Sequence, residues 1–369
     1  MIVSRRALIG GAVALAFAGS ARGADFGAAR YGKAMIIDGL SSLGALDPKA
    51  PGIADQLAVY RASGLTAIHQ TVGAAGNTPG RYGETLRRIA RYTRFIEALP
   101  DHLLHVRTAA DLAAAQASGR LGVIFGFQDT VPLETEVGRL DLFDLLGVRI
   151  VQLTYNKRNL VGDGCLEPGN AGLSDYGREV VAGLNARRMI VDASHAAQRT
   201  IAEAIAASTA PIAISHTGCR ALNDVPRNTT DAELRALADK GGVAGIYFMP
   251  FLRTNGQPRA ADVIRHVEHA VKVAGEDHVA IGTDGGIRGF VLDDAYAEGQ
   301  RRFYEERKAM GIAAPGEAPD VFNLIPDYNE PARFLKLADD LAARGWPARR
   351  IEKLLGANFA RLCADVWGR

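Results

Sequence analysis

Cysteine is scarce in this chain, which has three among its 369 residues: Cys165, Cys219 and Cys363. None of them has C-x-x-C spacing, so the sequence indicates neither a thiolate metal site nor a disulfide framework. A single disulfide stays open if the chain is exported, because disulfides persist in oxidising compartments.

An excess of charge of either sign is also missing. Lys and Arg number 43 and Asp and Glu 41, which gives a formal net charge of +2. This balance gives no reason to expect nucleic acid or an anionic membrane surface as a partner. A homodimer stays open. Low-complexity segments and internal linkers are absent as well, so we expect one globular domain after the N-terminal segment.

The N-terminal segment has the pattern of an export signal. Paired arginines, Arg5 and Arg6, precede an apolar run over 9–18 and then a group of small residues. The run is short for a transmembrane span, and paired arginines suit the twin-arginine route, which carries folded proteins. We expect a twin-arginine signal peptide over 1–23, a mature domain over 24–369 and a periplasmic location. An ordinary secretory signal and an uncleaved anchor are the alternatives.

Short apolar runs recur along the rest of the chain, each followed by helix-like sequence. Such runs, four to eight residues long, are typical of parallel strands that are buried on both faces. Eight runs are predicted to be strands: 34–40, 65–72, 122–127, 149–154, 189–193, 211–214, 242–248 and 279–282. Eight strand–helix units favour a single (β/α)8 TIM barrel over a doubly wound open sheet. Extra C-terminal helices, from 332 onward, are expected to pack on the outside.

Two neighbouring runs, in M-I-V-D-A-S-H and P-I-A-I-S-H, end in histidine. His195 and His216 therefore lie at the carboxyl ends of adjacent parallel strands, where barrels and open sheets place their chemistry. Because neutral imidazole is the commonest metal ligand, this pair predicts a metal site. The alternative is that each histidine only hydrogen-bonds loop backbone. His69, on the second strand, is a candidate replacement ligand or simply a packed histidine.

Several short motifs follow one another in a fixed order. They read L-G-V-R-I-V-Q-L-T-Y-N (146–156), G-L-S-D-Y-G-R-E-V-V (172–181), V-D-A-S-H (191–195), I-S-H-T-G-C-R-A-L (214–222), P-R-N-T-T-D (226–231), G-G-V-A-G-I (241–246), V-A-I-G-T-D (279–284) and L-L-G-A-N-F-A-R-L (354–362). In this order they resemble the membrane (renal) dipeptidase family of zinc peptidases, and so many ordered blocks are far more specific than one motif. The resemblance implies the same (β/α)8 barrel that the strand count predicts, and it further implies that the barrel is of the metal-dependent-hydrolase type.

The resemblance also implies a two-zinc site, of which this chain retains only part. In the family the ligands are a His-x-Asp after the first strand, a bridging Glu after the third, and the two strand-end histidines, which match His195 and His216. The family's D-G-H-N-D reads D-G-L-S-S here, so Leu40 and Ser42 replace the His and the Asp, while Gln128 replaces the Glu. Leucine cannot ligate, and neutral side chains cannot offset the repulsion between two Zn²⁺ ions.

The remaining matches imply roles around a smaller metal site. We expect one zinc ion rather than two, held by the two histidines with Gln128 or Asp284 and a water, and a site without metal is the alternative. Asp284 would carry the proton and Arg227 would bind a substrate carboxylate. Tyr155 stands where the family has a substrate-contacting histidine, and it would donate a hydrogen bond to the oxyanion. The structural alternatives are an ion pair for Arg227, loop-amide contacts for Asp284 and core packing for Tyr155.

These residues predict an exported hydrolase of the dipeptidase class, which cleaves the peptide bond of a small dipeptide-like substrate with metal-activated water. The losses at Leu40, Ser42 and Gln128 leave two alternatives open. One is an isomerase or tautomerase that tailors a peptide-derived metabolite such as a siderophore. The other is a catalytically inactive peptide-binding protein, against which the retained histidines argue.

Overall fold

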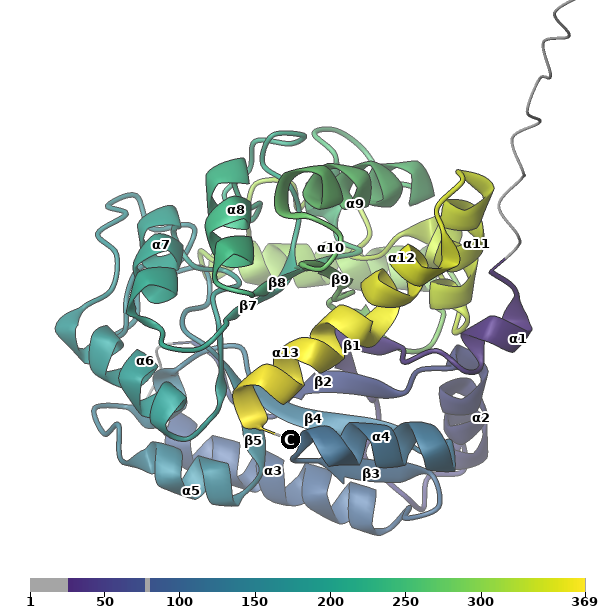
Figure 1. Cartoon of the computed structure of the whole chain (residues 1–369), viewed down its shortest axis with the longest axis horizontal. Helices are drawn as coiled ribbons and strands as arrows, with labels where there is room; N and C mark the ends of the chain where they lie inside the picture. The colour runs from purple at the N-terminus through teal and green to yellow at the C-terminus, as the bar shows by residue number, and fades with distance from the viewer. Residues whose placement is uncertain (1–25, 77–79, 369) are drawn as a thin grey trace, which may run out of the picture.

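A computed structural model describes residues 26–76 and 80–368. Eight parallel strands curl around one axis, and helices surround them (Figure 1). The barrel strands are β1 (Ile37–Ser42), β2 (Ala67–Thr71), β4 (Leu121–Phe127), β5 (Val148–Gln152), β6 (Ile190–Asp192), β7 (Ala213–Thr217), β8 (Val243–Ile246) and β9 (Val279–Ile281). Each lies within or overlaps one of the eight predicted runs, so the single (β/α)8 barrel is confirmed. The predicted signal peptide lies outside the described residues.

The barrel closes between its last and first strands. β9 pairs with β8, whereas β10 (Gly285–Gly286), which follows β9 after a short loop, pairs with β1 through Ser41 and Ser42. At the junction the buried Asp38 carboxylate accepts hydrogen bonds from Thr283 N at 2.7 Å and from Thr283 Oγ1 at 2.6 Å. These contacts join the two edges of the sheet where the barrel would otherwise stay open.

The sequence pattern does not predict β3 (Leu103–Val106), a four-residue strand outside the barrel order. β3 pairs with the first half of β4, on the side where the second half of β4 pairs with β5. The helices are α1 (Ala28–Tyr31), α2 (Ile53–Ser63), α3 (Arg81–Glu97), α4 (Ala109–Ser118), α5 (Arg139–Leu145), α6 (Asp175–Ala186), α7 (Gln198–Ala207), α8 (Asp231–Asp239), α9 (Ala260–Ala274), α10 (Asp294–Ala309), α11 (Arg333–Ala343), α12 (Ala348–Glu352) and α13 (Asn358–Trp367). Within residues 26–76 and 80–368, no helix is both long and apolar enough to cross a membrane.

The last helix corrects the expectation that the C-terminal helices all lie outside the barrel. α13 crosses the amino-terminal end of the strands (Figure 1). Its apolar side chains, among them Phe359 and Leu362, pack in one buried cluster with the first residues of several strands, such as Ile37, Ile190 and Val243. Cys363 belongs to the same cluster, and all three cysteines are free thiols. α13 therefore closes the end of the barrel that is opposite the expected site.

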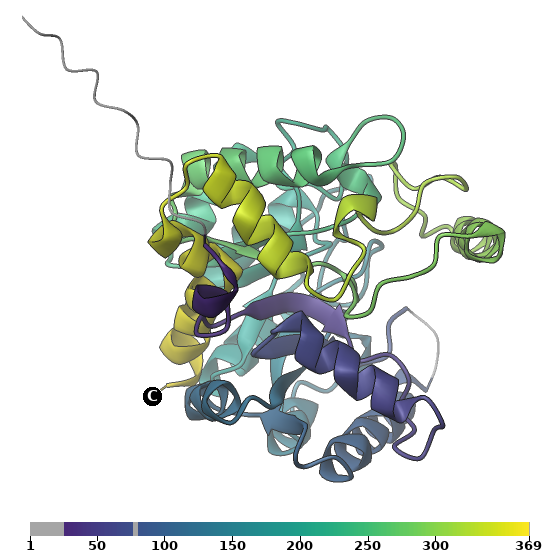
Figure 2. The ribbon, with the colours of Figure 1, turned by 90° about the vertical axis from the view of Figure 1, so that its right-hand side faces the viewer.

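Helix α10 lies on the other side of the barrel. Figure 2 shows it standing apart from the remaining elements, across the barrel from α13. Gln300 is the only buried residue of α10, all of which the structure describes. The sequence pattern gives no bounds for this helix, which brings side chains to the carboxyl ends of the strands.

Candidate active site

The carboxyl ends of the strands surround a pocket of about 170 Å³. Tyr155, His195, Arg227 and Asp284, which come from separate strand ends and loops, all line it. The structure thus brings together four of the residues that the sequence assigns to one site.

His195 follows β6 in a constrained backbone conformation. Its φ of 60° lies in the left-handed region, which non-glycine residues seldom adopt and which often marks a functional position. The side chain of Asn156, just after Tyr155, accepts a hydrogen bond from Nδ1 of His195 at 2.6 Å. Asn156 is itself oriented, because its Nδ2 donates to the carbonyl of Ile312 at 2.9 Å. Nε2 of His195 therefore carries the free lone pair.

A buried network fixes the ring of His216 in the same way. The Asp192 carboxylate accepts hydrogen bonds from the hydroxyls of Ser194, at 2.7 Å, and Ser215, at 2.5 Å. Because the Ser215 proton is used there, its oxygen accepts from Nδ1 of His216 at 2.8 Å. The lone pair of His216 is then on Nε2 as well. Asp192 and the two serines lie in the V-D-A-S-H and I-S-H motifs, but the motifs alone do not reveal this role.

Two glycines make room for the backbone before His216. The carbonyl of Ser215 turns toward Gly245 on β8 and toward Gly282, just after β9. A Cβ atom at either position would lie 2.0 Å from that oxygen, which only glycine avoids. The glycines of the G-G-V-A-G-I and V-A-I-G-T-D motifs thereby allow β7 to bulge between Ile214 and Thr217.

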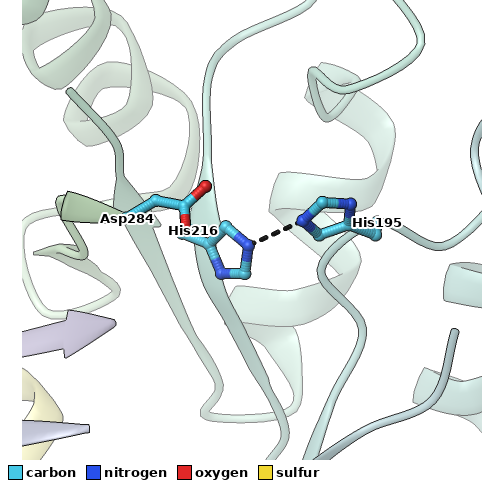
Figure 3. A group of neighbouring side chains, drawn as sticks. All are labelled: His195, His216 and Asp284. Atoms are coloured by element: carbon cyan, nitrogen blue, oxygen red, sulfur yellow. Dashed lines mark hydrogen bonds between the residues drawn. The ribbon is translucent and has the colours of Figure 1, made fainter. Parts of the chain in front are cut away.

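The two imidazoles form a geometry that suits a metal ion. Their Nε2 atoms lie 2.9 Å apart (Figure 3), and the tautomers above place a lone pair on each. Burial lowers the pKa of both rings well below the ordinary value, and Arg227 adds to this effect, so a shared proton is disfavoured. Ligand atoms of His195, His216 and Asp284 all lie within 4.8 Å of one another. Two converging lone pairs beside a carboxylate fit a cation, and hydrogen bonds on the other ring nitrogens are typical of zinc-binding histidines.

Asp284 completes the group from the loop between β9 and β10. Its backbone also has a left-handed φ, 56°, and its N–H donates to the carbonyl of Leu40 at 2.9 Å. Burial raises the pKa of Asp284 to about 6, although Arg227 and a hydrogen bond from the side chain of Gln128 oppose this. Gln128 thus reaches the group through Asp284, and its role as a metal ligand stays a prediction.

The end of β1 offers no second set of ligands. The Leu40 side chain is buried, and the Ser42 hydroxyl accepts a hydrogen bond from Gly44 N at 3.2 Å. His69 is fully buried, and its Nδ1 donates to the Gly39 carbonyl at 2.8 Å. His69 does not join the group of His195, His216 and Asp284, which is the only cluster of metal-ligating side chains found in the described part of the chain.

Arg227 lies in the loop after β7. Thr217 Oγ1 donates to its carbonyl at 3.1 Å, and its guanidinium lies 5.6 Å from the ring centre of Tyr247 and 5.7 Å from that of Phe251. The residue is only 3% exposed, and its Nη2 is buried without a hydrogen-bond partner in the described structure. An arginine beside two aromatic rings with an unused donor is typical of a site that binds an anion.

His266 on α9 is buried, and its contacts predict that the fold loses stability in acid. Its Nδ1 accepts from Cys219 N at 2.9 Å and its Nε2 donates to the Leu252 carbonyl at 3.0 Å, so only the neutral ring satisfies both contacts. Burial lowers the pKa of His266 to about 4, whereas the unfolded value is about 6.5, so the unfolded chain binds more protons between these values. We expect His266 to account for a loss of about 2 kcal/mol in the free energy of unfolding from pH 7 to pH 5. Urea unfolding at both pH values measures it.

The matched comparison for this prediction is His266→Asn, whose amide retains one donor and one acceptor but does not titrate. The loss between pH 7 and pH 5 should be smaller in the variant by the His266 contribution. Equal losses in wild type and variant would show that His266 does not titrate on unfolding.

Arg307 and Glu317 line the same pocket, although no sequence motif predicts them. Arg307 comes from α10, and its Nη1 donates to the hydroxyl of Tyr155 at 3.1 Å. Its Nε and Nη2 donate to the two carboxylate oxygens of Glu317 at 2.6 and 2.8 Å. The ring of Tyr155 in turn stacks on that of His195, with centroids 4.4 Å apart. No local pattern marks the two residues, because their approach depends on how α10 folds back over the barrel.

Comparison with known proteins identifies the family of this chain. The sequence pattern of the membrane dipeptidases, peptidase family M19, matches residues 62–296. The chain belongs to this family. Zinc is the metal of the family, and the chain is accordingly a metallodipeptidase-like enzyme of the hydrolase class.

Individual relatives agree with the family assignment. An uncharacterized dipeptidase of Schizosaccharomyces pombe is 32% identical over 209 residues, which are 54% of this chain and 50% of that protein. An amidohydrolase structure from Pseudomonas aeruginosa has a TM-score of 0.79 and 31% identity, and covers 92% of this chain and 98% of its own. A metallopeptidase from Rhodobacter sphaeroides, solved with a phosphinate mimic of the dipeptide L-Ala-D-Ala, has a TM-score of 0.73, 18% identity and coverage of 91% and 100%, and shows the fold alone.

Proposed function

We propose that this member of the membrane dipeptidase family hydrolyses small dipeptides in the pocket at the barrel mouth. The observation that carries the proposal is a pair of buried polar atoms, Arg227 Nη2 and Asn323 Oδ1, neither of which has a partner in the described structure. Both residues line the same pocket. A cationic donor and an amide acceptor complement the carboxylate and an N–H group of a dipeptide, which would satisfy both atoms.

One zinc ion suits this pocket better than two. His195, His216 and Asp284 would hold it, and two histidines with one carboxylate are a known composition of catalytic zinc sites. Leu40 and Ser42 supply no ligands for a second ion. When bound, the metal would polarise the substrate carbonyl and lower the pKa of a water.

The protein side chains provide the rest of the chemistry. Arg227 would bind the substrate carboxylate and fix the peptide bond next to the histidines. Tyr155 would donate a hydrogen bond to the carbonyl oxygen as charge develops there. A carboxylate oxygen of Asp284 would take the proton of the attacking water and return it to the leaving amine.

Elemental analysis of the purified chain, combined with a dipeptide screen, tests the proposal. We expect about one zinc per chain. We also expect cleavage of free dipeptides, which is measured by the amine that is released. Chelation should remove the activity and added zinc should restore it, which is the matched control for a contaminating peptidase. A chain that binds zinc yet cleaves none of a broad set of L,L and L,D dipeptides would contradict hydrolysis.

One observation favours a second candidate, because the end of β1 lacks the ligands that a two-metal hydrolase would need. An isomerase or tautomerase acting on a peptide-derived metabolite would need the pocket but not the second ion. NMR of candidate substrates would then show a rearranged product, and mass spectrometry would show that its mass is unchanged. Export to the periplasm is also part of the proposal, and fractionation of cells that express the whole chain tests it.

A further inference from the structure

We infer that Arg307 and Glu317 are positioning residues, which hold the Tyr155 hydroxyl so that its proton points at the substrate carbonyl. The inference rests on the proposed hydrolysis and extends it to α10 and the loop that follows. Neither residue belongs to the motifs that carry the family resemblance.

The ion pair fixes the guanidinium in one orientation. Arg307 binds both oxygens of Glu317, and the side chains are only 12% and 4% exposed. The carboxylate is held from its other side, since Glu317 Oε1 accepts from Ala314 N at 2.9 Å. Nη2 of Arg307 also donates to the Ile312 carbonyl at 3.2 Å. With these donors engaged, Nη1 is left to face Tyr155.

The contact between Arg307 and Tyr155 decides where the hydroxyl proton goes. A guanidinium can only donate, so the Tyr155 oxygen accepts from Nη1, and its own proton must point elsewhere. Among the described residues no acceptor for that proton is found. The ring cannot swing away easily, because it stacks on His195 at an interplanar angle of 24°. The proton is therefore free for a group in the pocket, and a cationic donor on its oxygen makes the hydroxyl a stronger donor.

A purely structural role explains this arrangement less well. α10 is largely exposed, and an ion pair on its solvent face, such as that of Arg301 with Glu298, would be enough to order a helix surface. Burying an ion pair costs desolvation free energy. We expect such a pair where its geometry orients another functional group. The Arg307–Glu317 pair is buried in the wall of the pocket that His195 and Asp284 also line.

A double-mutant cycle on kcat and KM for a cleaved dipeptide tests the inference. Y155F should lower kcat by about 100-fold with little change in KM, as expected when one oxyanion donor is lost. The paired change R307Q/E317Q, which keeps two amides in contact and avoids an unpaired buried charge, should lower kcat about 10-fold. The triple variant should be no slower than Y155F. R301Q/E298Q on the exposed face of α10 is the matched control and should match wild type.

The inference is overturned if the two losses multiply in the triple variant, or if R307Q/E317Q changes KM alone. Thermal unfolding checks that each variant is folded. Affinity for a phosphinate dipeptide mimic, measured by calorimetry, separates this failure from failure of the proposed function. If wild type binds the mimic but cleaves no dipeptide, hydrolysis fails, and the same cycle on the mimic's affinity decides the inference. If wild type binds no mimic and cleaves nothing, both are overturned.

Discussion

His216→Ala should remove zinc from the chain and lower kcat/KM for dipeptide cleavage by a factor on the order of 1,000. His216 is fully buried, and its Nε2 faces that of His195 at 2.9 Å, so no other side chain can take its place without rearrangement. A metal contributes several kcal/mol of charge stabilisation in such sites, and about 4 kcal/mol corresponds to a factor of 1,000. Elemental analysis and steady-state kinetics on the same preparation give both quantities.

His105→Ala is the matched control for this experiment. His105 is a partly buried histidine that lies on β3, where its ring packs on Phe125 with centroids 4.0 Å apart. The change should lower stability and leave the zinc content unchanged. Full zinc content in His216→Ala would place the metal elsewhere and would contradict the assigned ligands.

The barrel could be predicted because its strands obey a simple rule. Strands that are covered on both faces are continuous apolar runs, and the eight runs are separated by helix-length sequence. β3 escapes the rule because four residues, two of them only partly buried, give too little pattern. The position of α13 escapes it for another reason. An apolar stripe shows that one face of a helix is buried, but it does not show that the helix packs against the end of the barrel.

The residues of the candidate site also differ in whether they can be predicted from the sequence. His195 and His216 could be predicted because they end two neighbouring strands at the mouth of the barrel, whereas Asp284 is implied only by the resemblance to the family. Arg307 could not, since α10 has a charged sequence with a single buried residue and comes back to the mouth only through the tertiary fold. The hydrogen bonds that orient the histidines depend on where Asn156 lies relative to His195, and on where Ser215 lies relative to Asp192, which strand ends alone do not specify.

Arg227→Met should raise KM for a free dipeptide and lower kcat/KM by about 100-fold, with a smaller change in kcat. Methionine keeps an apolar stem beside Tyr247 and Phe251 but removes the buried cationic donor. Hydrogen bonds to charged groups contribute about 1.5–3 kcal/mol, so the loss of a two-pronged contact corresponds to roughly 10- to 100-fold or more. The effect falls on KM because the carboxylate is bound equally before and during the reaction.

The same dipeptide as its C-terminal amide is the control that makes this prediction specific. The amide has no carboxylate, so wild type should cleave it poorly, and Arg227→Met should cleave it about as well as wild type does. An equal loss on acid and amide would mean that Arg227 supports the pocket wall and does not recognise the substrate. A loss confined to the acid would fix the direction of the dipeptide, with its carboxyl end at Arg227 and its peptide bond beside His195 and Asp284.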